Sequence, residues 1–174
     1  MSKIPVFIVG INPRSGTNYL YHLLHIHPDC AVSRHVGEDF ILYGINHYLE
    51  FFRKVIFRWK KEWNNDPDLF QKFLEEGIIR YLDPDGSSAR FVITKTPDPT
   101  NIDLFLETFK SGYLIVITRN GQDLVESYVS SFRRRFEDAI RGWLRGARWI
   151  LKVMNDEKFR KSNRVIFIKY EDLF

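Results

Sequence analysis

The sequence predicts an α/β fold of three layers, in which helices cover both faces of a central, mostly parallel sheet. Short apolar runs alternate with segments of helical periodicity along the whole chain, and this alternation is typical of parallel strands joined by helices. The first and fourth runs are almost wholly apolar, which favours strands buried on both faces. We expect the strands at Ile4–Val9, Ala31–Val36, Phe91–Thr94, Tyr113–Thr118 and Val165–Ile168.

The beginning of the chain has the pattern of a strand, a loop and a helix. The first apolar run ends at Gly10, and Pro13 with Gly16 marks the loop that follows. Leucines at positions 20, 23 and 24 give helical spacing to residues 17–26, and Pro28 ends that helix.

The middle of the chain is less regular. The second run, 31–36, has a weaker strand composition, and residues 38–82 are mostly helical in pattern and rich in aromatic side chains. Asp83-Pro84-Asp85-Gly86 is a turn. After the third strand, a loop with two prolines leads into a short helix at 101–109.

The last third repeats the alternation of strand and helix. After the fourth strand, Asn120-Gly121 begins a helix that extends to Phe132. In the next helix, 140–154, apolar residues recur at i, i+3, i+4 and i+7, which makes an amphipathic stripe. The chain shows no internal repeat or linker, so we expect a single domain over residues 1–174.

Composition limits the classes of function. The 174 residues are 44% hydrophobic and 28% charged, and Cys30 is the single cysteine, so a disulfide scaffold is excluded. The net charge of +4 favours anionic ligands but is too small to indicate nucleic-acid binding. No apolar run approaches the roughly 20 residues of a membrane span, and the N-terminus lacks the features of a signal peptide. We therefore expect a cytoplasmic protein without a membrane segment.

The loop after the first strand has the features of an anion site. Ligands of open α/β sheets bind at the carboxyl ends of strands, and the N–H groups of a helix N-terminus attract anions. Gly16 allows an anion to approach the backbone, Arg14 adds charge, and Ser15, Thr17 and Asn18 add donors. The alternative is an ordinary turn with capping hydroxyls, but the convergence of donors favours a phosphate site.

This loop is not a Walker A motif. That motif has four residues between its glycines and then a lysine, whereas five residues separate Gly10 from Gly16 and no lysine follows. The fourth strand ends in Arg119 rather than in a carboxylate that would hold Mg²⁺. The pattern therefore predicts a nucleotide that is bound by arginine without a metal ion.

Two segments carry a resemblance to a known family. Pro13-Arg14-Ser15-Gly16-Thr17 resembles the 5′-phosphosulfate loop of sulfotransferases, which use 3′-phosphoadenosine 5′-phosphosulfate (PAPS). The segment 117–127 is similar to the family's 3′-phosphate segment, and the resemblance implies that Arg119 and Ser127 hold that phosphate together.

Two shorter matches extend the resemblance. Lys95 stands in a Lys-Thr-Pro sequence like that of Golgi-type sulfotransferases, and residues 170–173 resemble the Tyr-Glu-Asp-Leu turn of many members. The similarity reaches from Pro5 to the last residue and is thin across 39–88. It implies a P-loop-like phosphosulfate loop after the first strand and PAPS as co-substrate, with no metal. The residues implied to bind PAPS are Arg14, Ser15, Gly16, Thr17, Asn18, Arg119 and Ser127.

Sulfuryl transfer needs a base for the acceptor hydroxyl and positive charge at the leaving phosphate. Glu38 resembles the catalytic glutamate of tyrosylprotein sulfotransferases, although two neighbouring positions of that motif differ here. Asp39 and His35 stay open as alternative bases, and a solvated turn carboxylate is the non-catalytic interpretation of Glu38. Lys95 and Arg14 are expected to meet the phosphate oxygens, where negative charge develops.

Several questions stay open from the sequence. A glycan, a peptide tyrosine and a small alcohol stay open as the acceptor. We expect the aromatic residues of 40–73 mainly in the core, with a few of them lining the acceptor pocket. A P-loop small-molecule kinase and a non-catalytic nucleotide-binding module are the alternative functions. Family members continue past the Tyr-Glu-Asp-Leu turn with a loop that covers the nucleotide, and we expect this domain to lack that segment.

Overall fold

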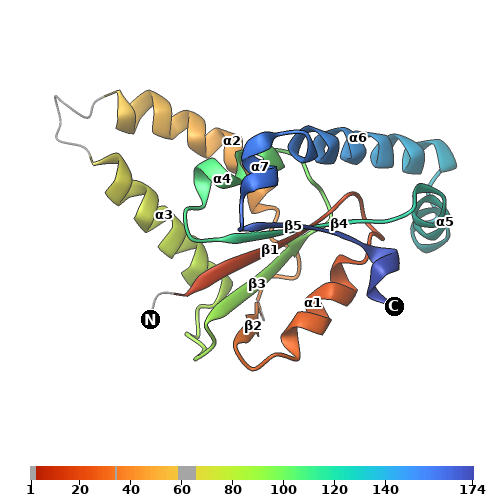
Figure 1. Ribbon diagram of the computed structural model, residues 1–174, viewed down its shortest axis with the longest axis horizontal. Coiled ribbons are helices and arrows are strands. Elements are labelled where there is room, and N and C mark those ends of the chain that lie inside the picture. Colours follow the sequence, from red (N-terminus) through yellow and green to blue (C-terminus); the bar gives the residue numbers. More distant parts are fainter. Residues whose placement is uncertain (1–2, 34, 59–65) are drawn as a thin grey trace.

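Five parallel strands form the central sheet of the computed structural model, which describes residues 3–33, 35–58 and 66–174 (Figure 1). The strands are β1 Ile4–Gly10, β2 Cys30–Val32, β3 Phe91–Thr96, β4 Tyr113–Thr118 and β5 Val165–Lys169. Their order is β2-β3-β1-β4-β5. Val6 of the middle strand β1 pairs with Ile93 of β3 on one side and with Tyr113 of β4 on the other. The predicted α/β fold with a parallel sheet is confirmed.

Helices cover both faces of this sheet. They are α1 Thr17–His25, α2 Ile41–Phe51 with a π-helical extension at Phe52–Phe57, α3 Pro67–Leu82, a 3-10 turn at Ile102–Leu104 that leads into α4 Phe105–Thr108, α5 Gly121–Phe132, α6 Phe136–Met154, α7 Glu157–Lys161 and the 3-10 turn η3 Tyr170–Leu173. α1 and η3 lie on one face, whereas α2, α4, α6 and α7 lie on the other (Figure 1). The short helix α7 shows no periodicity in the sequence and was not predicted.

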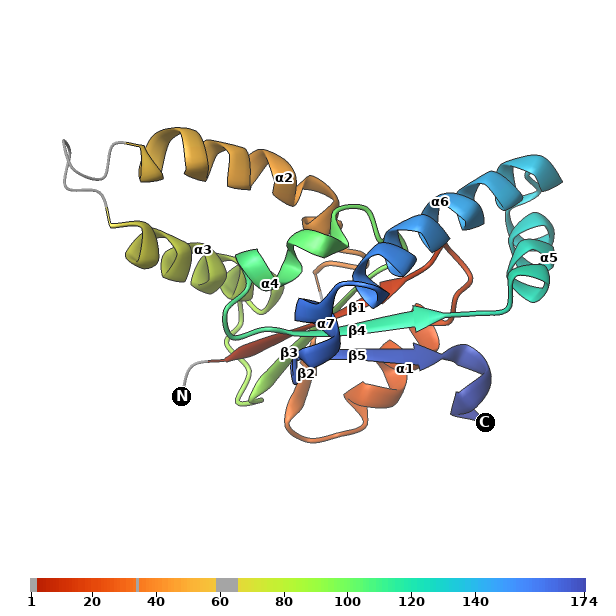
Figure 2. The same ribbon diagram turned by 45° about the horizontal axis from the view of Figure 1, so that its top comes forward.

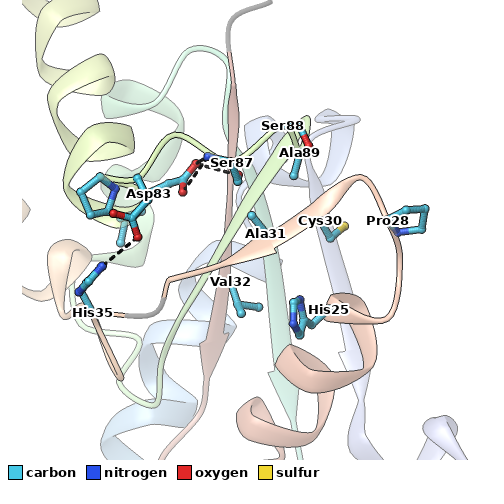
Figure 3. A pocket seen from close by; sticks show the side chains of 13 residues that line it. His25, Pro28, Cys30, Ala31, Val32, His35, Asp83, Ser87, Ser88 and Ala89 are labelled. Carbon is cyan, nitrogen blue, oxygen red and sulfur yellow. Dashed lines mark hydrogen bonds and ion pairs between the residues drawn. The ribbon is translucent and has the colours of Figure 1, made fainter.

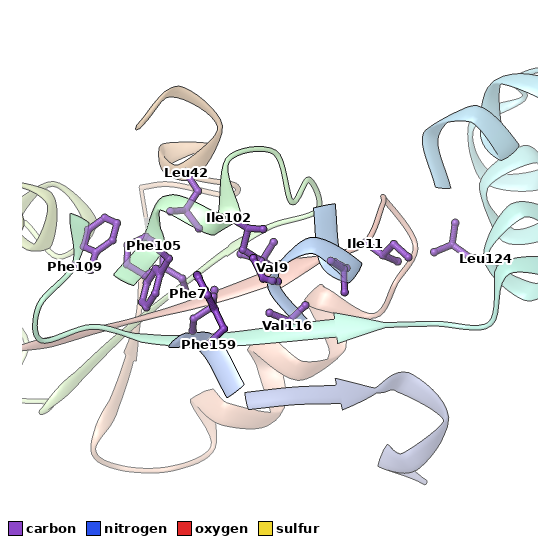
Figure 4. Packing of buried hydrophobic residues seen from close by; sticks show 13 residues of the cluster. Phe7, Val9, Ile11, Leu42, Ile102, Phe105, Phe109, Val116, Leu124 and Phe159 are labelled. Carbon is purple, nitrogen blue, oxygen red and sulfur yellow. The ribbon is translucent and has the colours of Figure 1, made fainter. Parts of the chain in front are cut away.

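Each face of the sheet has its own hydrophobic core. Phe7 and Val9 of β1 point to the side of α4 and α6, while Val6 and Ile8 point to the side of α1, because successive side chains of a strand alternate. In the larger core, the rings of Phe7, Phe105 and Phe109 have centroids 4.5–5.7 Å apart (Figure 4). β1 is therefore buried from both sides.

The edge strand β2 is shorter than the sequence predicts. It ends at Val32 rather than at Val36, where its pairing with β3 also ends. The carbonyl of Ser33 accepts a hydrogen bond from the Tyr21 hydroxyl, and its side chain accepts one from the backbone N–H of Val36, both at 3.1 Å. Glu38 therefore lies in a loop, several residues beyond the end of the strand.

The described residues of 38–82 include the helices α2 and α3, which each extend away from the sheet at one end (Figures 1 and 2). α2 and α3 run side by side in both views (Figures 1 and 2), and Phe70 of α3 stacks on Tyr48 and Phe52 at centroid distances of 5.9 and 5.8 Å. None of the described aromatic side chains of 40–73 is buried. The expectation that they lie mainly in the core is wrong for these residues, because they join the two helices or face solvent. Trp59 and Trp63 lie outside the described residues.

Helix α6 lies directly against the loop that follows β1. A Cβ atom at Gly146 would lie 1.8 Å from the carbonyl oxygen of Ile11, and one at Gly142 would lie 3.1 Å from the side chain of Asn12. The absence of a side chain at Gly146 thus allows the helix and loop backbones to touch. This contact sets where the loop lies above the sheet.

We expect Gly146→Ala to destabilise the fold by about 1–3 kcal/mol, because the added methyl group forces two backbones apart. Gly77→Ala in α3 is the matched control, since a Cβ there meets nothing within 4 Å. Alanine in a helix is more stable than glycine by roughly 0.5–1 kcal/mol, so the control is expected to gain stability. Urea unfolding measures both changes, and an unchanged midpoint for Gly146→Ala would contradict the close approach.

Candidate active site

The carboxyl ends of β1, β3 and β4 lie side by side, because the three strands are parallel and β1 is in the middle. The chain passes from β3 on one side of β1 to β4 on the other, so the strand order reverses beside β1. Ligands of open α/β sheets bind at such a point. The predicted site residues all lie on the segments that leave this edge of the sheet or at the ends of its strands.

The loop between β1 and α1 turns tightly. Arg14 and Gly16 have left-handed backbone conformations, with φ of 77° and 96°. The backbone N–H of Ser15 donates to the carbonyl of Asn12 at 3.2 Å. Arg14 is exposed whereas Ser15 is fully buried, so the loop presents the arginine charge outward.

The polar side chains around this loop point in different directions. Ser15 Oγ and Asn12 Nδ2 are buried and have no hydrogen-bond partner in the described part of the chain. Thr17 is buried at the start of α1, while Asn18 is exposed. Of the side chains predicted to bind the phosphosulfate, those of Arg14 and Asn18 are therefore the accessible ones, and the Ser15 hydroxyl faces inward.

The turn η3 supports both the loop and Arg119. A Cβ atom at Gly16 would lie 2.2 Å from the ring of Tyr170, so this contact requires glycine. The guanidinium of Arg119 lies 4.6 Å from the centroid of the same ring, which is a cation–π distance. Glu171 accepts a hydrogen bond from the backbone N–H of Asn120 at 2.7 Å, and this bond lowers the pKa of the Glu171 carboxyl.

The two predicted anion segments meet at one point. Arg14 Nε donates to Ser127 Oγ at 3.1 Å, and Arg119 Nη1 donates to the carbonyl of Arg14 at 3.0 Å. Arg119 Nε is buried without a partner among the described residues. The side chain of Asn120 caps α5 by accepting from the backbone N–H of Gln122 at 2.9 Å. Two guanidinium groups thus converge at one point, which favours an anion there.

Lys95 and Glu38 form a second part of the site. Lys95 near the end of β3 is 8% exposed, and its Nζ lies 3.5 Å from Glu38 Oε1 and 5.7 Å from the ring centroid of Tyr21. The side chain of Glu38 is 37% exposed. A buried ammonium group therefore holds a solvent-accessible carboxylate at the edge of the sheet.

Asp39, the first alternative base, is engaged in local structure. Its Oδ2 accepts from the Thr94 hydroxyl at 2.6 Å, and its Oδ1 accepts from the backbone N–H of Ile41 at 2.7 Å. Burial raises the pKa of the Asp39 carboxyl. Asp39 thus joins the start of α2 to β3.

His35, the second alternative base, faces a different neighbour. Its Nε2 lies 3.3 Å from a carboxylate oxygen of Asp85, beside a cavity of about 320 Å³ next to β2 (Figure 3). Among the three candidates, Glu38 is the one whose side chain contacts the ammonium group of Lys95.

Sequence reasoning assigned no role to Tyr21, Tyr170 or Glu171. The Tyr-Glu-Asp-Leu sequence was a signal for the last two, but their contacts with Gly16, Arg119 and Asn120 follow only from the position of η3. Tyr21 carries no signal of its own, since its approach to Lys95 depends on how α1 packs over β3.

Comparison with known proteins agrees with the resemblance. A model of the sulfotransferase family matches residues 5–174. The chain belongs to the sulfotransferase family. Membership implies transfer of a sulfuryl group from a sulfate donor to a hydroxyl acceptor. A comparison with curated protein sequences gives no match.

Solved sulfotransferase structures share the fold. Two are sulfotransferase domains, from the curacin biosynthetic pathway and from the Synechococcus PCC 7002 olefin synthase. They are 19% and 21% identical, each with a TM-score of 0.60 over 99% of this chain and 69% of its own. A sulfotransferase from Alicyclobacillus acidocaldarius is 17% identical, with a TM-score of 0.56 over 99% of this chain and 75% of its own.

Two features are absent from the described residues. None of their helices has the length and apolar composition that crossing a membrane requires. They also contain no group of three or more His, Cys, Asp or Glu side chains that could hold a metal ion.

Asp39 gives a pH-dependent prediction. Because its pKa is raised on folding, the folded chain holds this proton more tightly than the unfolded chain. The resulting stabilisation is fully present below the ordinary aspartate pKa and is lost as the pH rises through the raised pKa. Asparagine does not titrate, so we expect Asp39→Asn to lack this pH-dependent loss of stability. The free energy of unfolding of the variant, relative to that of the wild type, is therefore expected to rise from acid to neutral pH. Urea unfolding across this range measures the difference, and a constant difference would contradict the effect of burial.

Proposed function

We propose that this chain transfers the sulfuryl group of PAPS to an acceptor hydroxyl without a metal ion. The observation that supports this most is the meeting of two anion segments through the Arg14–Ser127 hydrogen bond and the bond from Arg119 to the Arg14 carbonyl. A nucleotide with phosphate groups at both its 3′ and 5′ positions needs two such segments close together. A nucleotide with a single phosphate chain needs only the first.

We assign each phosphate group of PAPS to one segment of the chain. The loop at 13–18 takes the 5′-phosphosulfate, with Arg14 and the N-terminus of α1 as its positive groups. Arg119 and Ser127 take the 3′-phosphate. The Nε of Arg119 is buried and has no partner among the described residues, which supports this assignment. Its N–H group can donate a hydrogen bond to an anion without first breaking another bond.

The transfer step uses the second part of the site. The proton of the acceptor hydroxyl passes to Glu38, the oxygen forms a bond to sulfur, and the bond between sulfur and the 5′-phosphate oxygen breaks. The electron pair of that bond stays on the phosphate, where Lys95 and Arg14 stabilise the growing negative charge. The 3.5 Å contact between Lys95 and Glu38 supports a site that holds the base and the cation together.

Calorimetry tests the donor assignment. We expect adenosine 3′,5′-bisphosphate to bind more tightly than ATP with Mg²⁺ and to bind equally well with a chelator. Arg119→Ala is expected to lower the preference for the bisphosphate over adenosine 5′-monophosphate by roughly 10- to 100-fold, the usual effect of losing a charge-assisted contact. Arg80→Ala removes the same charge from the exposed face of α3 and is the control.

The other outcomes of this experiment favour the other functions. Tighter binding of ATP with Mg²⁺ would favour a small-molecule kinase. Tight binding of the bisphosphate without sulfated product from any acceptor would favour a non-catalytic binding module. An unchanged preference in Arg119→Ala would show that the 3′-phosphate is bound elsewhere.

A pair of isosteric variants tests the base. We expect Glu38→Gln to lower kcat by roughly 100- to 10,000-fold, as the loss of a general base does, with little change in the affinity for the bisphosphate. Asp39→Asn is the matched control, because an amide can still bond to Ile41 and Thr94, and it is expected to keep most activity. Full activity in Glu38→Gln together with loss in Asp39→Asn would transfer the role to Asp39.

A further inference from the structure

Phe40, two residues after Glu38, has an unfavourable backbone conformation. Its φ and ψ are 49° and 19°, in the left-handed region, which is uncommon for a bulky side chain. Three neighbouring hydrogen bonds hold it there. The N–H of Asp39 donates to the Lys95 carbonyl at 3.2 Å, that of Phe40 donates to Thr96 Oγ1 at 3.1 Å, and that of Ile41 donates to the Asp39 side chain at 2.7 Å.

This conformation does not bury the phenylalanine ring. Phe40 is 45% exposed and Tyr43, one turn further along α2, is 53% exposed. The two rings meet edge to face with centroids 6.5 Å apart and planes at 82°. Strained residues cluster at functional sites when the surrounding structure holds them in place. A strained residue whose ring stays in solvent is unexplained by packing and points to a ligand.

The backbone of Tyr43 is held by a second residue with a positive φ. Asn101, in the loop after β3, has a φ of 63°, and its Nδ2 donates to the Tyr43 carbonyl at 2.7 Å and to Asn46 Oδ1 at 3.2 Å. The first turn of α2 is therefore fixed to the carboxyl end of β3 by Phe40 and Asn101 together. The backbone that carries the two exposed rings is therefore held in place.

The strand order puts these rings on the side of the site away from the 3′-phosphate segment. Arg119 follows β4, which lies on one side of β1. Lys95 is in β3 on the other side, and the backbone before α2 is hydrogen-bonded to β3. The leaving group is the 5′-phosphate, which the proposed function assigns to the loop after β1, so the β3 side is free for the acceptor. Phe40 follows Glu38 by two residues, and the exposed rings therefore lie near the proposed base, where we expect the acceptor.

We propose that Phe40 and Tyr43 form a platform for the acceptor, which carries its hydroxyl on a planar aromatic ring. This inference rests on the proposed function and narrows it to one substrate class. Offset and edge-to-face contacts with two rings favour a flat π-system over an aliphatic chain. A phenolic hydroxyl also ionises at a pH of about 10. It is thus more acidic than an alcohol, and a carboxylate base removes its proton more easily.

Kinetics with matched acceptors tests the platform. We expect Phe40→Ala and Tyr43→Ala each to raise KM for 4-nitrophenol by roughly 3- to 10-fold, in line with the loss of one ring–ring contact. Affinity for adenosine 3′,5′-bisphosphate is expected to stay unchanged. KM for cyclohexanol is expected to be high and insensitive to both changes, and Phe40→Tyr is expected to keep the wild-type KM for the phenol. Phe73→Ala, which removes a 59% exposed ring from α3, is the control.

Two results would overturn the platform. One is an unchanged KM for the phenol in both alanine variants, and the other is an equal rise in KM for cyclohexanol. Turnover of methyl glucoside but not of phenols would assign the site to sugars and also overturn it.

Acceptor binding without turnover separates this inference from the proposed function. Line broadening of the fluorine signal of 4-fluorophenol reports binding to the wild type in the presence of adenosine 3′,5′-bisphosphate. Loss of this broadening in Phe40→Ala but not in Phe73→Ala would support the platform even if no sulfated product forms. No broadening with the wild type would overturn it. Failure of the bisphosphate to bind would overturn the proposed function, whereas the binding of 4-fluorophenol would still show whether the two rings hold an aromatic ligand.

Discussion

Hydrogen bonding of β1 to β3 on one edge and to β4 on the other is the constraint on which the rest of this molecule depends. It brings the loop at 11–16 between the ends of two other strands. The register cannot slip, because a shift by one residue would move Phe7 and Val9 out of the core they share with α4 and α6. The close contact of Gly146 with Ile11 then holds the start of the loop from above.

This central position gives the site two sides. On the β4 side, Arg119 and Ser127 reach the loop, and η3 supports them through Tyr170 and Glu171. On the β3 side, Lys95 holds Glu38, and α2 begins with two exposed rings. Sulfuryl transfer needs groups that contact both the donor and the acceptor, and the proposed function assigns such groups to these two sides.

The same edge of the sheet contains several features that reduce stability. Arg14, Phe40 and Asn101 all have positive φ, and Ser15, Asn12 and Arg119 each leave a buried polar atom unpaired among the described residues. Buried polar groups without partners cost free energy. The extensive apolar contacts of β1 and β4 offset this cost elsewhere in the sheet. The concentration of such features at one edge agrees with a site whose geometry is set for a ligand.

Local pattern alone was enough to predict the five strands and most of the helices, whereas the two anion segments stay a prediction. Buried strands are apolar runs, surface helices have apolar residues at helical spacing, and a glycine-containing loop before a helix attracts anions wherever it occurs. The fold class therefore follows from neighbours in the chain. The end of β2 was misplaced, because a serine that bonds to Tyr21 has no distinctive local pattern.

Packing decided which of these residues meet. Arg14 and Ser127 are 113 positions apart, and their contact depends on the strand order, which no local pattern specifies. The same holds for the surroundings of Glu38, Asp39 and His35. Each follows β2 closely, and only the structure shows that their partners are Lys95, Thr94 and Asp85. The aromatic residues of 40–73 were expected in the core because ring composition favours burial. Those that the structure describes stay exposed or half-buried, because parts of α2 and α3 extend away from the sheet, and composition carries no information about that direction.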